Sequence, residues 1–351
     1  MSEKRPPFRV AFTADLYAAD GSCPYKDIGL DVLRSHSHIL YRGFPEHRQH
    51  LDPDQIADAN ALIVLTPRVT AKTLSHSRDL CAVIRYGVGY DSVDVPACTA
   101  AEVLAIIATS AVDRSVGEAT VAWMLALTHK VLVKDRLLRE CRWNERTKYM
   151  GSELRDRVFG AVGLGGIARA TISLLRGFGM KPPIAFDPYV KEAAARDLGV
   201  RLVSLDDLLR TADFVSIHCP LNDETRNLIG ARELALMKPD AYLINTARGG
   251  IVDETALYEV LKTRRIRGAA IDVFAEEPVL KPHPFAEVED AILAPHSVAW
   301  TDEIFRDIGR VVCQAAVDLS LGKRPRGVLN PGLFEDPSFE RKWARLRGEG
   351  W

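Results

Sequence analysis

The chain has 351 residues, a length that corresponds to two domains, or three at most, at roughly 100 to 200 residues per domain. Its 46 Lys and Arg residues nearly balance 47 Asp and Glu residues, so the net charge of −1 excludes bulk electrostatic attraction to nucleic acid or to a membrane surface. With 47% apolar and 26% charged residues, the composition is that of a globular protein with a large core.

No apolar run approaches the roughly 20 residues that cross a bilayer, and the first residues, Met-Ser-Glu-Lys-Arg-Pro-Pro, lack the apolar segment of a secretory signal. We therefore expect a cytoplasmic protein. The cysteines form no Cys-x-x-Cys pair and have no His partner at zinc-finger spacing, so we expect reduced thiols and no metal site. They are Cys23, Cys81, Cys98, Cys141, Cys219 and Cys313.

The first part of the chain alternates short β-branched runs with helical stretches. The pattern predicts strands at residues 8–13, 61–65, 82–85 and 103–107, with a helix at 71–80 between two of them. Such alternation is typical of βαβ units and a parallel sheet. A long helix follows at 116–133, because apolar residues recur there at helical spacing; it is long enough to connect two domains, and its apolar middle could form an oligomer contact.

A second α/β series follows that helix. Ser204 and Asp207 resemble a capping box at the start of one of its helices. We expect a nucleotide-binding domain at residues 110–298, and a last helix at 301–321. We further expect residues 299–351 to return to the N-terminal sheet, which makes 1–109 and 299–351 one discontinuous domain. The predicted strands of the second series are 158–162, 184–186, 214–217, 242–244, 268–271 and 291–293.

A glycine motif follows the strand at 158–162. Residues 163–168 read Gly-Leu-Gly-Gly-Ile-Ala, and an amphipathic helix continues from them. In the G-x-G-x-x-A fingerprint the first glycine makes the tight turn, the second lets the backbone approach a pyrophosphate, and the small last residue lets the helix pack on the strand. Glycine-rich turns also occur for packing alone, but the order of strand, motif and helix favours a dinucleotide site.

An acidic residue, Asp187, ends the next predicted strand, at about the 20-residue distance expected for a carboxylate that binds the adenosine ribose. Its charge would repel a 2′-phosphate, so the sequence favours NAD over NADP. Lys191 lies nearby in the sequence and leaves NADP use open.

Three later loops each place an ionisable residue just after a predicted strand: Arg248, Glu277 and His296. Ligands of open parallel sheets bind at the carboxyl ends of the strands. A 2-oxo acid that accepts hydride needs a proton on its carbonyl oxygen, which His296 can give; Glu277 would stabilise the imidazolium, and Arg248 can fork onto the substrate carboxylate.

Each of these residues also has a structural explanation on its own. His296 could belong to a capped loop, Glu277 could be surface charge, and Arg248 could pair with a nearby aspartate. Their shared position after consecutive strands of an expected NAD domain favours the catalytic interpretation.

Six segments in this order resemble the D-isomer-specific 2-hydroxyacid dehydrogenases, over about residues 60 to 330. That family includes phosphoglycerate dehydrogenases, glyoxylate and hydroxypyruvate reductases, D-lactate dehydrogenases and the C-terminal binding proteins. The segments are Val-Gly-Leu-Gly-Gly-Ile at 162–167, Phe-Asp-Pro-Tyr at 186–189, His-Cys-Pro-Leu at 218–221, Asn-Thr-Ala-Arg-Gly-Gly at 245–250, Asp-Val-Phe at 272–274 with Glu-Pro at 277–278, and Pro-His at 295–296.

The resemblance implies an α/β fold in which a Rossmann NAD-binding domain is inserted in a flavodoxin-like substrate domain, both with parallel sheets, and a homodimer. It also implies that Arg248, Glu277 and His296 are the catalytic residues. The implied cofactor-binding residues are Gly163, Gly165, Gly166, Ile167, Asp187, Pro220, Thr225, Thr246 and Asp272. The implied substrate-binding residues are Tyr86, Gly87, Val88 and Gly89, whose backbone amides receive the substrate carboxylate, together with Arg248.

Three positions depart from the family pattern. Ala168 replaces the usual third glycine, and Gly117 stands where alanine is common; both are small-for-small changes. Trp300 stands where many members have small residues, so it either lines the substrate pocket or packs at the start of the last helix.

The sequence thus predicts an NAD-dependent oxidoreductase that interconverts a D-2-hydroxy acid and its 2-oxo acid. Two alternatives stay open. One is an NADH-sensing binding protein of the C-terminal binding protein type. The other, suggested by Trp300, is an NAD-dependent enzyme that acts on an unusual sugar acid or a non-carboxylate.

Overall fold

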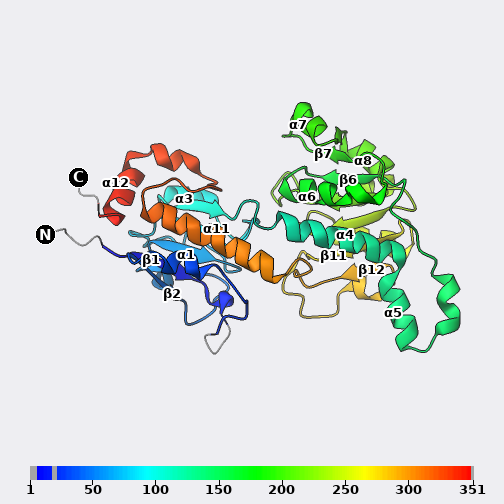
Figure 1. The fold of residues 1–351 in the computed structure, drawn as a ribbon, viewed down its shortest axis with the longest axis horizontal. Helices are drawn as coiled ribbons and strands as arrows, with labels where there is room; N and C mark the ends of the chain where they lie inside the picture. The colour runs from blue at the N-terminus through cyan, green and yellow to red at the C-terminus, as the bar shows by residue number, and fades with distance from the viewer. Residues whose placement is uncertain (1–5, 18–21, 349–351) are drawn as a thin grey trace. The chain divides into compact units, whose positions relative to one another are not determined.

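The structure is a computed structural model that describes residues 6–17 and 22–348. The chain forms two compact units. Unit 1 comprises residues up to Val112 and from Trp300 onward, and unit 2 comprises Asp113–Ala299. These boundaries lie a few residues from the expected ones at 109/110 and 298/299. Figure 1 shows both units, and each is described here by itself.

Unit 1 is built on a five-stranded parallel sheet with the order β2-β1-β3-β4-β5. This is the strand order of flavodoxin-like folds. Burial on both faces explains the nearly continuous apolar runs, because β3 is buried at every position. The strands are β1 (Phe8–Phe12), β2 (Ile39–Gly43), β3 (Ala61–Val64), β4 (Ala82–Arg85) and β5 (Leu104–Ile107).

The long helix α11 (Asp302–Ser320) lies beside α1 (Leu30–Arg34) against this sheet, as Figure 1 shows. Thr301 caps its N-terminus, since the Thr301 side chain accepts a hydrogen bond from the Ile304 amide at 3.1 Å. The chain then returns to β5, where the Leu329 amide donates to the Ala105 carbonyl at 2.8 Å. The other helical segments are η1 (Ala14–Leu16), α2 (Pro53–Ile56), α3 (Val95–Ala100), η5 (Pro331–Glu335) and α12 (Pro337–Leu346).

Unit 2 is built on a seven-stranded parallel sheet with the order β12-β11-β10-β9-β6-β7-β8. Its first six strands in the chain follow the 3-2-1-4-5-6 order of the Rossmann fold, with β12 added beside β11. The prediction of an α/β fold with two parallel sheets is therefore confirmed. The strands are β6 (Phe159–Val162), β7 (Ile184–Phe186), β8 (Arg201–Leu202), β9 (Phe214–Ile217), β10 (Tyr242–Asn245), β11 (Gly268–Ile271) and β12 (Ala291–Leu293).

One face of this sheet is covered by two helices that pack side by side, α4 (Asp113–His129) and α6 (Gly166–Leu175) (Figure 1). Met124, Leu127 and Ala168 bury their side chains there with the aromatic residues of the strands. The remaining helical segments are α5 (Val131–Arg139), η2 (Trp143–Lys148), η3 (Arg176–Phe178), α7 (Glu192–Asp197), α8 (Leu205–Thr211), α9 (Ala231–Leu236), α10 (Glu254–Lys262) and η4 (Pro284–Glu287).

Two predicted helices differ from the structure. The stretch 71–80 forms turns, because Ser75 and Ser77 hydroxyls donate to backbone carbonyls three residues earlier, and such local bonds compete with a helix. The expected helix at 116–133 is interrupted at Lys130, which adopts a left-handed conformation with φ 55° and separates α4 from α5. Strands β2 and β8 were not predicted; β8 has only two residues.

Among the described residues, no single helix has the length and apolar character to cross a membrane. Helices α4 and α5 have the necessary length and apolar character only when they are taken together, and the two helices are bent by 58° relative to each other. Within 6–17 and 22–348, no group of three or more His, Cys, Asp or Glu side chains is placed to hold a metal ion.

Candidate active site

Three adjacent strands of unit 2 end in the loops that carry Arg248, Glu277 and His296. The strands β10, β11 and β12 pair in parallel register, with Asn245 opposite Ile271 and Ile271 opposite Leu293. Because parallel strands present their carboxyl ends at one edge, these loops leave the sheet side by side. We refer to Arg248, Glu277 and His296 as the trio.

His296 and Glu277 form a direct pair. The His296 Nδ1 atom lies 2.7 Å from the Glu277 Oε2 atom, and both side chains are partly exposed. His296 itself adopts a left-handed backbone with φ 52°, and its amide donates to the Asp272 carbonyl at 2.7 Å. The Phe274 amide donates to the other carboxylate oxygen of Glu277 at 2.9 Å. The pair is thus held from both sides by backbone.

The electrostatics of this pair favour an ionised carboxylate next to the imidazole. Burial raises the pKa of Glu277, but the hydrogen bond and charge of His296 and the Phe274 amide more than offset this, so the pKa is lowered overall. With Nδ1 engaged by the carboxylate, the Nε2 atom of His296 is left to exchange a proton with a ligand.

Asp272 is a buried carboxyl group at the end of β11. Its Oδ1 atom accepts hydrogen bonds from the Ser297 and Val298 amides at 2.8 and 3.1 Å, which fixes the loop after His296. Burial raises the pKa of Asp272 to about 6, against the opposing effect of those two amides. The group therefore supports the His296 loop from the strand edge.

The Arg248 loop is fixed by Asn245 and Gly249. The Asn245 side chain accepts from the Ala247 amide at 3.1 Å and donates to the Arg248 carbonyl at 2.9 Å. A Cβ at position 249 would lie 1.9 Å from the carbonyl carbon of Phe274, so only glycine allows this close approach. The contact joins the Arg248 loop to the Glu277 loop.

The chemistry available at this edge is proton exchange beside a cation. An imidazole backed by a carboxylate can give or take a proton near neutral pH, and a guanidinium can hold a carboxylate or stabilise charge on an oxygen. Arg248 is close enough to lower the pKa of Glu277 electrostatically, so the three groups act on one region.

The other half of the same edge carries the glycine loop, residues 163–168. Gly163 has φ +95° and follows β6, and α6 begins at Gly166. The N-cap residue Gly165 offers no side-chain cap, and a Cβ there would meet nothing within 4 Å. The first amides of α6 are thus left for an anion, and a pyrophosphate fits this terminus.

Asp187 connects the end of β7 to the glycine loop. Its Oδ2 atom accepts from the Leu164 amide at 2.8 Å, and its Oδ1 atom accepts from the Tyr189 and Val190 amides at 2.9 and 3.1 Å. On the other side of Leu164, the Arg169 Nε atom donates to the carbonyl at 3.0 Å. The loop is therefore held in shape before any ligand binds.

Among the buried polar side chains that have no hydrogen-bond partner in the described part of the chain, two lie just beyond the carboxyl ends of the middle strands. They are the Thr246 hydroxyl, just after β10, and both ring nitrogens of His218, just after β9. Burial lowers the pKa of His218 to about 4, so its ring is neutral at physiological pH. Unpartnered buried polar atoms at a strand edge fit a site that a ligand with hydrogen-bonding groups completes.

The loop after β9 brings Pro220 and Thr225 together. The Thr225 hydroxyl donates to the Pro220 carbonyl at 2.6 Å, and the Asn222 amide donates to the same hydroxyl at 2.8 Å. Unit 2 thus places all the residues that sequence reasoning assigned to the cofactor on the loops of β6, β7, β9, β10 and β11.

The predicted carboxylate-binding loop follows β4 in unit 1. Tyr86 is buried, and its hydroxyl donates to the Phe305 carbonyl at 2.5 Å, so this side chain belongs to the core. The amides of Tyr86 and Gly87 donate to the Val64 and Arg85 carbonyls. Within the described residues, the amides of Val88 and Gly89 form no hydrogen bond, so they are the ones able to receive an anion.

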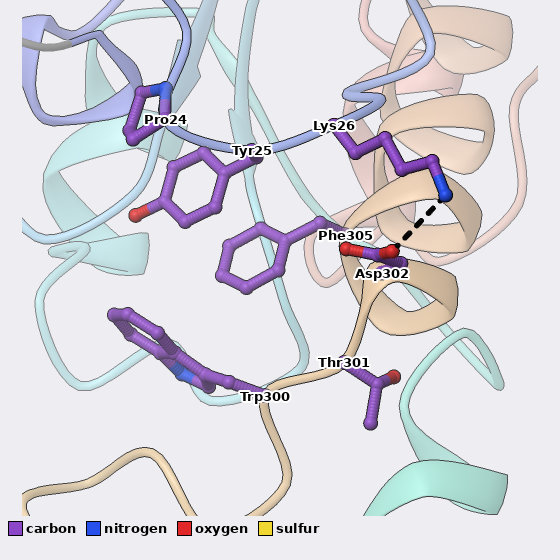
Figure 2. A pocket seen from close by; sticks show the side chains of 7 residues that line it. All are labelled: Pro24, Tyr25, Lys26, Trp300, Thr301, Asp302 and Phe305. Atoms are coloured by element: carbon purple, nitrogen blue, oxygen red, sulfur yellow. Dashed lines mark hydrogen bonds and ion pairs between the residues drawn. The ribbon is translucent and has the colours of Figure 1, made fainter.

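Trp300 lines a hollow in unit 1 with a volume of about 180 Å³ (Figure 2). Tyr25 and Phe305 stack with ring centroids 3.8 Å apart, and the 54%-exposed Trp300 meets Phe305 edge-on at 5.2 Å. At the rim, the Lys26 ammonium lies 3.3 Å from the Asp302 carboxylate. Trp300 therefore lines a hollow of unit 1 and packs at the start of α11, and its contact with a substrate stays a prediction.

Sequence reasoning missed several residues that shape these sites. Asn245 lies inside a segment singled out for Arg248, and an Asx-turn pattern could have identified it. Asp113 at the start of α4 and Tyr25 carry no motif. Tyr25 joins Trp300 only through the packing of α11 against the N-terminal segment, which no local pattern reveals.

Comparison with known proteins gives a match to one family model. The model described as "D-isomer specific 2-hydroxyacid dehydrogenase, NAD binding domain" matches residues 121–298. This range contains β6 to β12, the glycine loop and the trio.

Three relatives show how far the similarity extends. The D-3-phosphoglycerate dehydrogenase of Methanocaldococcus jannaschii is 36% identical over 279 residues, which cover 79% of this chain and 53% of the relative. The glyoxylate reductase of Korarchaeum cryptofilum is 32% identical over 319 residues, which cover 89% of this chain and 96% of the relative. The D-lactate dehydrogenase of Aquifex aeolicus, solved with NAD and lactic acid, superposes with a TM-score of 0.77 at 25% identity and covers 89% of this chain and 96% of that chain.

The chain spans about half the length of the phosphoglycerate dehydrogenases that it matches, 53% of the Methanocaldococcus protein. It spans nearly the whole of the glyoxylate reductase and of the lactate dehydrogenase, at 96% each.

Proposed function

Because the chain belongs to the D-isomer-specific 2-hydroxyacid dehydrogenase family, we propose that it is an NAD-dependent oxidoreductase that interconverts a D-2-hydroxy acid and its 2-oxo acid. The observation that carries this proposal is the trio on three adjacent strand ends, with the His296 Nδ1 atom 2.7 Å from the Glu277 carboxylate.

His296 is the acid and base of the reaction. Glu277 holds Nδ1, so the Nε2 atom gives its proton to the carbonyl oxygen of a 2-oxo acid during reduction and takes the hydroxyl proton back during oxidation. The nicotinamide, when bound, supplies or accepts the hydride. The lowered pKa of Glu277 keeps a negative charge beside the imidazolium that forms.

Arg248 binds the substrate carboxylate and polarises the reacting carbonyl, because its planar guanidinium can form two parallel hydrogen bonds. The Asn245 and Gly249 contacts hold its backbone in place. The substrate-binding loop after β4 contributes through backbone rather than side chain: Gly87 provides the turn, and the amides of Val88 and Gly89 receive the carboxylate. Tyr86 acts only by packing.

The cofactor is held by the loops of unit 2. The amides at Gly165, Gly166 and Ile167 would hold the pyrophosphate at the start of α6, with Gly163 making the turn. Asp187 would bind the adenosine ribose. Pro220, Thr225, Thr246 and Asp272 would line the rest of the site, since the loops of the middle strands carry them.

The Asp187 carboxylate selects NAD over NADP, because a 2′-phosphate would lie against a like charge. Its three bonds to backbone amides keep the carboxylate in place. Lys191 is the residue through which NADP could still be accepted. It lies a few residues after Asp187, directly before α7, and could pair with a 2′-phosphate.

Trp300 contacts the substrate side chain through the hollow shown in Figure 2. The hollow is lined by rings rather than by a cluster of cations, which favours apolar substituents on the acid.

The protein acts as a cytoplasmic homodimer. The exposed apolar side chains of α5 and the segment after it support a second copy as the partner, because exposed apolar residues close together in the chain can form an interface. They are Val131, Leu132, Leu138, Trp143 and Met150. The two alternatives from the sequence, an NADH-sensing binding protein and an enzyme of an unusual sugar acid, have no comparable support in the relatives described above.

The test is NADH oxidation, followed by absorbance, with glyoxylate, hydroxypyruvate, pyruvate, phenylpyruvate, oxaloacetate and 3-phosphohydroxypyruvate. We expect turnover with at least one of these acids, and loss of that turnover in His296→Asn. Tight NADH binding without turnover of any acid would contradict the dehydrogenase and favour the sensor.

A further inference from the structure

Asp113 places a carboxylate against the first turn of α6. A Cβ at position 166 would lie 2.1 Å from its Oδ2 atom and 2.6 Å from its Oδ1 atom, so only glycine leaves room for the group. Within the described residues, the carboxylate accepts no hydrogen bond that would account for this placement. It therefore stands half-buried beside Gly166 with no hydrogen-bond donor of the described chain holding it there.

The location is electrostatically unusual. Asp113 lies in the first turn of α4, which packs beside α6, so the carboxylate is next to the N-terminal ends of two helices. Helix N-termini attract anions, which explains why a carboxylate can stay there half-buried. The same amides of α6 are the ones that a dinucleotide pyrophosphate would use.

We infer that Asp113 is a built-in competitor of the cofactor pyrophosphate, and that it takes up a proton when the dinucleotide binds. This rests on the proposed placement of the dinucleotide at the glycine loop. A like charge within a few ångströms disfavours the ionised form of a carboxyl group, so the bound pyrophosphate favours neutral Asp113. Cofactor affinity consequently falls as pH rises.

The charged groups around Asp113 leave this direction unchanged. Arg169 of α6 favours the ionised form, but burial is the larger effect and raises the pKa of Asp113 already without a cofactor. Arg114 of α4 is paired with Glu118 on its own helix. Asp187 reaches the loop at Leu164 and adds a further negative charge.

The direction in which NADH affinity changes with pH follows from these pKa shifts. Below the pKa of the free protein, Asp113 is neutral in both states and the affinity does not depend on it. Above that pKa, binding requires a proton, so the Kd for NADH rises with pH until the pKa of the bound state is passed. Asp272, whose pKa burial raises to about 6, also titrates within the pH range of the experiment, so the difference in Kd between wild type and an Asp113 variant is the informative quantity.

The experiment measures the Kd of NADH by fluorescence titration from pH 5.5 to 9, in steps of about one unit, for wild type and Asp113→Asn. We expect Asp113→Asn to bind NADH about tenfold more tightly at pH 8 and to show a flatter pH profile. Calorimetry in two buffers of different ionisation enthalpy should show proton uptake in wild type that is reduced in the variant. Asp113→Ser should behave in the same way and covers the case in which the asparagine variant does not fold.

Two controls test whether the effect arises from the Asp113 carboxylate and from the phosphates of the ligand. Asp240→Asn removes a carboxylate that is 71% exposed and paired with Arg267, and it should leave the NADH profile unchanged. Adenosine has no phosphate, so its affinity should be equal in wild type and Asp113→Asn, whereas ADP should follow NADH. Equal or weaker NADH binding in both Asp113 variants would overturn the inference, as would an undiminished proton uptake.

If the dinucleotide does not bind at the glycine loop, the titrations give a different result from the failure of the Asp113 inference. If wild type bound neither NADH nor adenosine at pH 6, the dinucleotide site at the glycine loop would be wrong, and the Asp113 inference with it. If both bound and Asp187→Ala altered NAD selectivity, the placement would stand, and unchanged NADH binding in the Asp113 variants would then overturn the Asp113 inference alone.

Discussion

The two halves of the carboxyl edge of the seven-stranded sheet use different parts of the chain. At β10 to β12, charged side chains carry the candidate site, and hydrogen bonds with the backbone amide of Phe274 and the backbone carbonyl of Asp272 hold Glu277 and His296 in place. At β6 and β7, the site is mostly backbone, and the side chain of Asp187 serves partly to fix a loop through the Leu164 amide. Substitution of a trio residue should therefore harm the chemistry, and substitution in the glycine loop or at Asp187 should harm cofactor binding.

Replacing His296 by Asn should have the largest effect on turnover. Removal of a general acid and base costs on the order of 100-fold or more in kcat, while the Kd of NADH stays near that of wild type because the cofactor half is untouched. Stopped-flow or steady-state kinetics with the best 2-oxo acid measures the first quantity and fluorescence titration the second.

His76→Asn is the control, since the Nδ1 atom of His76 also pairs with a neighbouring side chain, the Ser75 hydroxyl at 3.0 Å, but His76 lies in unit 1, outside the loops that carry the trio. It should retain turnover. An unchanged kcat in His296→Asn would remove His296 from the mechanism, and a weakened NADH affinity would blur the division between the two halves.

Arg248→Lys should lower kcat/KM by about tenfold or more, because an ammonium cannot form the paired hydrogen bonds of a guanidinium. The loss should be similar for every 2-oxo acid, since all carry the carboxylate. Arg232→Lys, a change at an exposed ion pair with Asp206, serves as the control. Equal kcat/KM in Arg248→Lys and wild type would argue against carboxylate binding by this residue.

Gly249→Ala tests whether the close backbone approach between the Arg248 and Glu277 loops is needed for stability and turnover. The new Cβ would meet the Phe274 carbonyl carbon, so the loops of Arg248 and Glu277 must separate. We expect a loss of about 1–3 kcal/mol in the free energy of unfolding, together with reduced turnover. Gly177→Ala is the control because a Cβ there would meet nothing within 4 Å. Equal urea midpoints for the two variants would show that the close approach does not matter.

Asp187→Ala should have the smallest of these effects, a several-fold loss of the preference for NAD over NADP. Removing the carboxylate removes its repulsion toward a 2′-phosphate, but the loop also loses a hydrogen bond at Leu164. The ratio of kcat/KM for NADH and NADPH measures the change. An unaltered ratio would defeat the assignment of Asp187 to the ribose.

Much of the fold could be predicted from sequence because the strands of both parallel sheets are short apolar runs between polar turns. The strands at 82–85 and 268–271, for instance, match β4 and β11. Strand β2 was missed because its sequence, Ile-Leu-Tyr-Arg-Gly, is only partly buried and lacks a continuous apolar run. The end of α4 at Lys130 was missed because a left-handed lysine carries no sequence signal of a helix end such as glycine.

The candidate site residues also divide into those that could be predicted from sequence and those that could not. The trio and the glycine loop follow strand ends in the sequence, so their positions could be predicted from order alone. Asp113 could not, because its contact with Gly166 depends on how α4 packs beside α6. The buried position of Tyr86 was also hidden, since its hydroxyl reaches the Phe305 carbonyl from a distant part of the chain.

The most direct test of the proposed reaction is transfer of deuterium from NADH in which both hydrogens at C4 of the nicotinamide are deuterium, with the product analysed by mass spectrometry and on a chiral column. We predict a 2-hydroxy acid that carries deuterium at C2 and has the D configuration, and no such product from His296→Asn. A product without deuterium at C2, or of the L configuration, would contradict the assignment of this protein as a D-2-hydroxyacid dehydrogenase.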